Sequence, residues 1–168
     1  MRLTERQEQA YGYWRDGHDL SVLGVSGTGK TTLALHLALE HGDNLPVRVL
    51  ICTNRLPMHL AAYEKLIDKR YGRDSTKGMI KTGRLSVTNE PFVPEDRCVL
   101  VIDEFQFNQY EFVPPEVLGG TLASPCRKIL CSYCLDPLAL RNEPPPDTLG
   151  PTFKTIDLGV KYCHYLIR

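Results

Sequence analysis

The fold of this chain is decided by the stretch Gly24-Val25-Ser26-Gly27-Thr28-Gly29-Lys30-Thr31. It fits the pattern G-x-x-x-x-G-K-[ST], which is the phosphate-binding P-loop. Its glycines let the backbone curl so that successive N–H groups point inward at phosphate oxygens. Lys30 can reach the β- and γ-phosphates, and the Thr31 hydroxyl can ligate Mg²⁺. The residues predicted to bind the nucleotide here are Gly24, Ser26, Gly27, Thr28, Gly29, Lys30, Thr31 and Thr32.

The segments on either side of this stretch have the composition that a P-loop requires. Residues 20–23 form a short apolar run typical of a strand, and residues 32–41 are typical of a helix that stops at Gly42. A helix that begins near Lys30 directs its positive amino-terminal end at the same phosphates. A chance match in a glycine-rich turn would require neither flanking element, so we interpret the motif as a nucleotide site.

Strand-like and helix-like segments alternate along the rest of the chain. Helices are expected at about 5–16 and 57–71, and further strands at 47–52, 98–102, 129–134 and 153–158. Residues 72–97 are polar and interrupted by glycine and proline, so they are expected to hold at most a short strand near 85–87. This alternation predicts an α/β fold, a three-layer sandwich whose central sheet is mostly parallel.

Two acidic residues, Asp103 and Glu104, follow the fully apolar run at residues 98–102. Ligands of open parallel sheets bind beyond the carboxyl ends of the strands, so both acids are expected to face the P-loop. We assign Asp103 to Mg²⁺ beside Thr31, through the water shell of the ion. Glu104 is expected to orient or deprotonate the attacking water. The predicted catalytic residues are thus Lys30, Asp103 and Glu104, the predicted metal site is Thr31 with Asp103, and the expected cofactors are ATP and Mg²⁺.

The composition of the 168-residue chain limits the classes of protein to which it can belong. Twenty basic and twenty acidic residues cancel, so a nucleic-acid surface must be a local patch. No apolar run approaches the ~18 residues of a membrane span, and the charged first ten residues do not resemble a secretory signal. We therefore expect a cytoplasmic protein with no membrane partner. Its six cysteines would then be free thiols or metal ligands. Cys131 and Cys134 should point to opposite faces of a strand, which favours buried thiols over zinc.

The order of the motifs resembles that of superfamily 1 DNA helicases. Val101-Ile102-Asp103-Glu104-Phe105-Gln106 resembles their D-E-x-Q motif, and residues 26–32 are similar to their P-loop variant. Leu3-Thr4-Glu5-Arg6-Gln7, which has the form of a helix capping box, resembles their Q motif. Residues 52–55 stand where the family has a Thr-Asn motif, and residues 135–140 stand at the place of its Gly-Asp-Pro-x-Gln sensor.

This resemblance implies a fold, a set of partners and roles for individual residues. It covers nearly the whole chain as a single RecA-like P-loop NTPase domain, residues 1–168, equivalent to the first of two such domains in the helicases. Gln7 would read the adenine edge, and Gln106 and Asp136 would complete the nucleotide site. The partner would be single-stranded nucleic acid, with DNA favoured and RNA as the alternative. The residues that would contact it are Thr53, Asn54 and Arg55.

Three departures from the family pattern limit what the resemblance implies. Leu135 replaces the sensor glycine, and Leu138 or Ala139 stands where its glutamine belongs. An Asn-Tyr-Arg signature near the end of the chain is missing. The second RecA-like domain, which supplies the arginine finger in the family, is absent from this sequence. One such domain is expected to bind ATP and hydrolyse it slowly, and to need a second RecA-like domain or subunit to translocate.

Two other functions stay open on sequence grounds. Thymidine kinases also combine a P-loop with a D-E-x-Q-F sequence, here residues 103–107, and with Cys-x-x-Cys pairs. A nucleoside kinase is therefore the first alternative, although a zinc ribbon is not recognisable and the Q motif and Asp136-Pro137 favour the helicase interpretation. The second alternative is a non-catalytic subunit that binds ATP or nucleic acid, which the altered sensor favours slightly.

Overall fold

The computed structural model describes residues 4–105, 115–133 and 153–158 of the chain. These residues contain one sheet of parallel strands in the order β3-β2-β4-β5-β1-β6. Because neighbouring strands are parallel, their carboxyl ends lie along one edge of the sheet. The strands are β1 (Asp19–Gly24), β2 (Val47–Ile51), β3 (Leu85–Thr88), β4 (Val99–Asp103), β5 (Arg127–Tyr133) and β6 (Phe153–Asp157). The predicted α/β fold with a parallel central sheet is confirmed.

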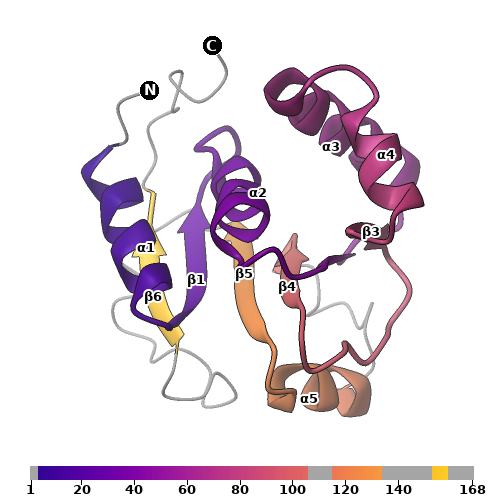
Figure 1. Cartoon of the computed structure of the whole chain (residues 1–168). Helices are drawn as coiled ribbons and strands as arrows, with labels where there is room; N and C mark the ends of the chain where they lie inside the picture. Colours follow the sequence, from indigo (N-terminus) through magenta and orange to yellow (C-terminus); the bar gives the residue numbers. More distant parts are fainter. Residues whose placement is uncertain (1–3, 106–114, 134–152, 159–168) are drawn as a thin grey trace.

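The helices are α1 (Glu5–Arg15), α2 (Lys30–His41), α3 (Leu56–Tyr71), α4 (Ser75–Lys81) and α5 (Pro115–Ala123). In Figure 1, α1 and α2 lie over the viewed face of the sheet, and α5 lies at the amino end of β5. Buried side chains of α1, α2 and α3 belong to one core cluster, whereas α5 contributes Leu122 to a second cluster. In the figure, α1 begins at the same side of the molecule as the loop between β1 and α2, which places the amino end of α1 near the carboxyl edge of the strands.

The central strand β4 is buried on both of its faces. Val99 and Val101 belong to the cluster beneath α2 and α3, and Leu100 and Ile102 belong to the cluster on the opposite face. A strand covered on both faces has no polar side to present, which explains the uninterrupted apolar run before Asp103. The apolar strand therefore delivers this carboxylate to the edge of the sheet from the middle of the core.

Trp14 fixes the end of α1 to the end of α2. Its side chain is fully buried, and its indole N–H donates a hydrogen bond of 2.8 Å to the backbone carbonyl of His41. The guanidinium of Arg127, at the start of β5, lies 3.5 Å from the centre of the indole ring. A cation at this distance from the face of a tryptophan is held by the ring quadrupole. Trp14 therefore serves to pack the first helix against the rest of the core.

The sequence-based assignment missed two helices, α4 and α5. Residues 75–81 contain Gly78, and the segment is held by a neighbouring helix: the Asp68 carboxylate accepts hydrogen bonds from the backbone N–H groups of Asp74 and Thr76 and from the Thr76 hydroxyl. Residues 115–123 contain the pair Gly119-Gly120, which disfavours a helix by propensity. In both cases tertiary contacts outweigh local preference, because only the folded chain brings Asp68 or the second core cluster into reach.

Candidate functional site

The loop between β1 and α2 has the closed geometry of a P-loop. Gly27 and Gly29 have φ angles of 81° and 87°, in the left-handed region that side chains with a Cβ rarely enter. The Thr28 hydroxyl donates to the carbonyl of Val25 at 2.8 Å and is buried, so it closes the loop on itself. The Lys30 ammonium donates to the carbonyls of Gly24 and Val25 at 2.9 and 3.0 Å. The ammonium therefore lies next to the loop at which phosphate groups are predicted to bind.

The two helices nearest this loop differ in how their amino ends are capped. On α1, Thr4 and Gln7 form a capping box in which each side chain accepts a hydrogen bond from the other residue's backbone N–H. On α2, the N-cap is Gly29, which has no side chain, and the first turn carries no acidic residue. The first N–H groups of a helix have no partner within the helix. Because Gly29 offers no capping side chain, the first N–H groups of α2 are available to an anion at the loop. The positive end of the helix dipole also attracts such an anion.

Asp103 meets the P-loop across the sheet. Its side chain is 3 % exposed, and its Oδ2 accepts a hydrogen bond of 2.8 Å from the hydroxyl of Thr31, which lies 72 positions earlier. Its Oδ1 accepts the backbone N–H of Glu104 at 2.9 Å. A hydroxyl and a carboxylate are oxygen ligands that Mg²⁺ accepts, directly or through water. The residues predicted to hold the ion are therefore in direct contact, and they fit it.

A third donor reaches the same carboxylate from α3. The Tyr63 hydroxyl donates to Asp103 Oδ2 at 2.6 Å, and its side chain is buried. Burial, and then the negative charge of Asp103, raises the pKa of Tyr63 well above its ordinary value. The phenol therefore stays protonated and acts as a donor. No motif in the sequence indicated a role for Tyr63. It was only one of the apolar positions that recur with helical spacing in residues 57–71.

Glu104 has an unusual backbone conformation. Its φ angle is +55°, a left-handed value that residues other than glycine adopt rarely. Such conformations cost free energy and are found mainly where the surrounding structure fixes them, often at functional sites. Here the chain turns directly at the end of β4, with the N–H of Glu104 on Asp103. The turn places Glu104 at the carboxyl edge of the sheet, next to the residues predicted to bind magnesium.

The predicted nucleic-acid residues follow β2 at the same edge. Ile51 lies beside Asp103 in the register of β2 and β4. Thr53 is buried, and its hydroxyl accepts the backbone N–H of Arg55 at 3.0 Å, whereas Asn54 and Arg55 are exposed. Asn89, which no sequence motif indicated, donates its amide to the Thr53 carbonyl at 2.9 Å. The structure thus brings two exposed polar side chains to the rim, and it assigns Thr53 to holding the turn.

The remaining predicted residues divide into one that the structure places and two that it does not describe. Gln7 is 2 % exposed and its side-chain oxygen accepts the N–H of Thr4 at 2.9 Å, at the amino end of α1. Gln106 and Asp136 lie outside the described residues. The carboxyl end of β5, which leads toward Asp136, is near the loop, since the Lys30 ammonium lies 5.9 Å from the ring centre of Tyr133.

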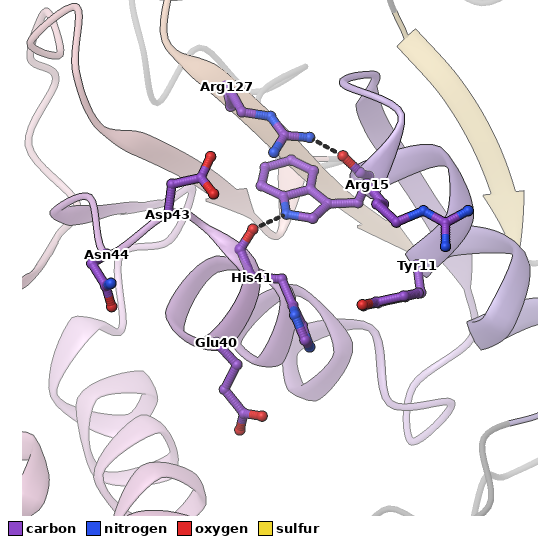
Figure 2. Close-up of a pocket in the computed structure, with 8 residues that line it drawn as sticks. Tyr11, Arg15, Glu40, His41, Asp43, Asn44 and Arg127 are labelled. Carbon is purple, nitrogen blue, oxygen red and sulfur yellow. Dashed lines mark hydrogen bonds between the residues drawn. The ribbon is translucent and has the colours of Figure 1, made fainter.

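A polar cavity of about 360 Å³ lies at the other end of α2, away from the P-loop (Figure 2). Its walls come from the last turns of α1 and α2, the turn after α2 and the start of β5. Because α2 has twelve residues, this cavity is about 18 Å along the helix from the P-loop. The cavity and the predicted nucleotide site are therefore separate. The lining residues are Tyr11, Trp14, Arg15, Glu40, His41, Asp43, Asn44 and Arg127.

Three side chains near this cavity could in principle bind a metal ion. Ligand atoms of His36, Glu40 and His41 all lie within 4.8 Å of one another. The Glu40 carboxylate is already engaged, however. One of its oxygens accepts hydrogen bonds from the Arg70 guanidinium and, at 2.7 Å, from the Tyr71 hydroxyl. A guanidinium in contact neutralises the carboxylate and opposes a second cation. The cluster is therefore explained by an ion-pair network between α2 and α3.

Cys52 and Cys131 behave as buried thiols, whereas a hydrogen bond from Cys98 lowers the pKa of Cys126. Burial raises the pKa of Cys52 to about 12 and raises the pKa of Cys131 well above its ordinary value. Metal ligation requires a thiolate, so neither environment favours zinc. Cys134 and the Cys163-His164 pair lie outside the described residues. Within the described ranges, no helix combines the length and the apolar character that a membrane span requires.

Two structures of Pif1 helicases are similar to this chain in fold. The Pif1 helicase from Candida albicans has a TM-score of 0.47 at 15 % identity, and a structure of two coordinating Pif1 helicases on forked DNA has 0.48 at 13 %. Each alignment covers 95 % of this chain, which spans only 40 % and 44 % of those chains.

Other comparisons add no assignment of function. The structure of PCH-2 from C. elegans has a TM-score of 0.36 at 16 % identity, with 91 % of this chain and 41 % of that chain covered. No protein-family model and no curated protein matches the chain. At these identities the similarity concerns the fold alone. The function is therefore inferred from the geometry of the site.

Proposed function

We propose that this chain is a Mg²⁺-dependent ATPase domain of the superfamily 1 helicase type, acting on single-stranded nucleic acid. The observation that carries the proposal is the hydrogen bond of 2.8 Å between the Thr31 hydroxyl and Asp103 Oδ2, beside a closed glycine loop and its lysine. Two residues 72 positions apart meet only because a P-loop and an acidic strand end share one sheet edge. This pairing is the arrangement that magnesium–triphosphate chemistry requires.

The residues of the site have distinct tasks in the proposed reaction. Lys30 and the N–H groups at the start of α2 bind the β- and γ-phosphates, which neutralises charge as the terminal phosphoryl group leaves. Thr31 and Asp103 would hold Mg²⁺, which would supply positive charge to offset the negative charge of the phosphate groups. Glu104 orients the water that attacks the γ-phosphate and accepts its proton.

Single-stranded nucleic acid is the proposed partner at the rim beside β2. The support is the exposure of Asn54 and Arg55 directly after this strand, at the edge that also carries Asp103. An exposed guanidinium binds phosphate in a bidentate manner, and phosphate contacts dominate affinity for nucleic acids. We further propose that a second RecA-like domain or subunit completes the ATP site, because the described residues contain one parallel sheet with one P-loop.

One assay tests the proposal against its alternatives. Phosphate release from ATP is measured with Mg²⁺ alone, with single-stranded DNA, with single-stranded RNA and with thymidine as an acceptor. We expect turnover that depends on Mg²⁺ and that rises with a single strand. Formation of thymidine monophosphate would instead identify a nucleoside kinase. Nucleotide binding without turnover under all four conditions would identify a non-catalytic subunit, and both results would overturn the proposal.

A further inference from the structure

The Asp103 carboxylate is held by hydrogen bonds from three neutral groups. Its Oδ2 accepts the hydroxyls of Thr31 at 2.8 Å and Tyr63 at 2.6 Å, and its Oδ1 accepts the N–H of Glu104 at 2.9 Å. Among the described residues no basic side chain pairs with Asp103. The three donors fix its orientation without cancelling its charge, which leaves that charge available to a cation.

Tyr63 is the donor that does not belong to the P-loop or to the strand end. It lies on α3, whose buried residues are Tyr63 and Ile67. The first turns of this helix are more open, and Met58 is exposed. The hydroxyl of Tyr63 is therefore a buried polar attachment of α3 to the carboxyl edge of the sheet. A displacement of α3 across the sheet would lengthen this hydrogen bond and release the carboxylate.

We propose that Tyr63 is a positioning residue for Asp103, through which the seating of α3 on the sheet sets the affinity of the site for Mg²⁺. This inference rests on the proposed function, since it assumes that Asp103 holds the ion. Groups that hydrogen-bond to a metal ligand orient it, and their loss typically lowers metal affinity or activity 10- to 100-fold. Because Tyr63 is buried and donates its hydroxyl to Asp103, it would contribute through that carboxylate.

The same helix supplies a matched control. Tyr71 also donates its hydroxyl to a carboxylate, that of Glu40, at 2.7 Å. Tyr63→Phe and Tyr71→Phe therefore remove the same atom from the same helix, and each leaves one carboxylate with one donor fewer. The two carboxylates lie at opposite ends of α2, and only the change at Tyr63 affects the magnesium-binding edge. Any effect on Mg²⁺ that both variants share reflects the stability of α3.

The experiment measures the affinity of the full chain for a fluorescent ADP analogue as Mg²⁺ is titrated, and ATP turnover where it is detected. We expect Tyr63→Phe to need about tenfold more Mg²⁺ for half-maximal effect, with kcat lowered about tenfold and KM for ATP changed less than twofold. Tyr71→Phe should match the wild-type protein in each of these values. Thermal unfolding of both variants verifies that they are folded.

A double-mutant cycle with Asp103→Asn is the second measurement. If Tyr63 acts through Asp103, the change at Tyr63 has no further effect on the Mg²⁺ response once Asp103 is replaced. A wild-type Mg²⁺ response in Tyr63→Phe, or an equal loss in Tyr71→Phe, overturns the inference. So does an effect that persists in the Asp103→Asn background. Absence of turnover in the wild-type protein would overturn the proposed function alone, because the Mg²⁺ titration of nucleotide binding does not need hydrolysis.

Discussion

Charged side chains lie at both ends of α2, but their partners differ between the two ends. At the carboxyl end, Glu40 is in contact with the Arg70 guanidinium and faces His36 at 3.2 Å. At the amino end, Lys30 donates to backbone carbonyls and Asp103 accepts from neutral donors. In the described part of the chain, neither Lys30 nor Asp103 forms an ion pair. At the carboxyl end the charges are paired within the protein, whereas among the described residues those at the amino end are not.

This difference supports the ligand proposed for the amino end. A buried or half-buried charge without a counter-charge costs free energy, so folded proteins retain such charges mainly where a ligand supplies the missing partner. Magnesium–triphosphate carries both signs: its phosphates match Lys30, and its metal ion matches Asp103. The complete network around Glu40 offers no such pair of vacant charges. The comparison therefore separates a candidate reaction site from a structural ion pair on the same helix.

Removal of the lysine should have the largest effect. Lys30→Ala deletes the side-chain cation that the proposed site directs at the β- and γ-phosphates, so we expect ATP turnover to fall at least about a thousandfold and nucleotide binding to become weak. Isothermal titration with ADP and Mg²⁺, together with phosphate release, measures both. Lys65→Ala, at an exposed position of α3, is the control. Wild-type nucleotide affinity in Lys30→Ala would place the triphosphate elsewhere.

The next largest effect is expected at Glu104. Glu104→Gln keeps the size of the side chain but removes its ability to accept a proton, so turnover should fall by about a hundredfold or more while ADP binds as in the wild-type protein. Glu40→Gln, the same change at the other end of α2, should leave turnover unchanged. Single-turnover phosphate release provides the rate. If Glu104→Gln hydrolyses ATP at the wild-type rate, another group activates the water.

The juxtaposition of the P-loop with Asp103 could be predicted from sequence because each part carries a local signal. The glycine spacing fixes the loop around Lys30, and the uninterrupted apolar run before Asp103 marks a buried parallel strand. A general rule about the carboxyl ends of parallel strands then places the two together. Tyr63 and Asn89 could not be predicted in this way. Several apolar positions of α3 share the same helical rhythm, and only the packed structure decides which of them reaches Asp103.

The fold was predictable to a similar extent and for similar reasons. Each strand assigned from the sequence is present within one or two residues, because apolar runs bounded by polar turns are local features. The helices α4 and α5 were missed because their stability depends on distant groups. Thr76 is held by Asp68 of the preceding helix, and α5 tolerates Gly119-Gly120 where Leu122 packs on the second core cluster.

Arg55 extends the comparison to the rim beside β2. It is exposed and forms no ion pair within the described residues, whereas Arg73, also exposed, lies 3.9 Å from Asp74. We expect Arg55→Ala to weaken binding of a single-stranded oligonucleotide about three- to tenfold and to reduce the salt dependence of binding by about one phosphate contact. Fluorescence anisotropy at several salt concentrations measures both quantities. An equal loss in Arg73→Ala would mean that general surface charge, and not the rim, binds the strand.

The smallest effect is expected from Glu40→Gln, and it concerns stability. The hydrogen bond from Arg70 is the main cause that lowers the pKa of Glu40 to about 2 from its ordinary value of 4.5. A carboxyl group whose pKa is lower in the folded state stabilises the protein above its unfolded pKa, and this stabilisation is lost as the pH falls through the folded value. Because the Glu40 side chain is 29 % exposed, the contribution at neutral pH should be about 1 kcal/mol or less.

Urea unfolding of the wild-type protein and of Glu40→Gln, measured from neutral pH down to about pH 2, tests whether the ion pair of Glu40 stabilises the carboxyl end of α2. The difference in unfolding free energy should be constant above pH 4.5, shrink below that value and disappear near pH 2. Glu90→Gln, at an exposed position, should show no such trend. A difference that does not change with pH would mean that Glu40 stabilises the protein through packing of its side chain. Glu40 and Asp103 would then differ only in their hydrogen-bond donors, because a paired cation would stabilise neither carboxylate.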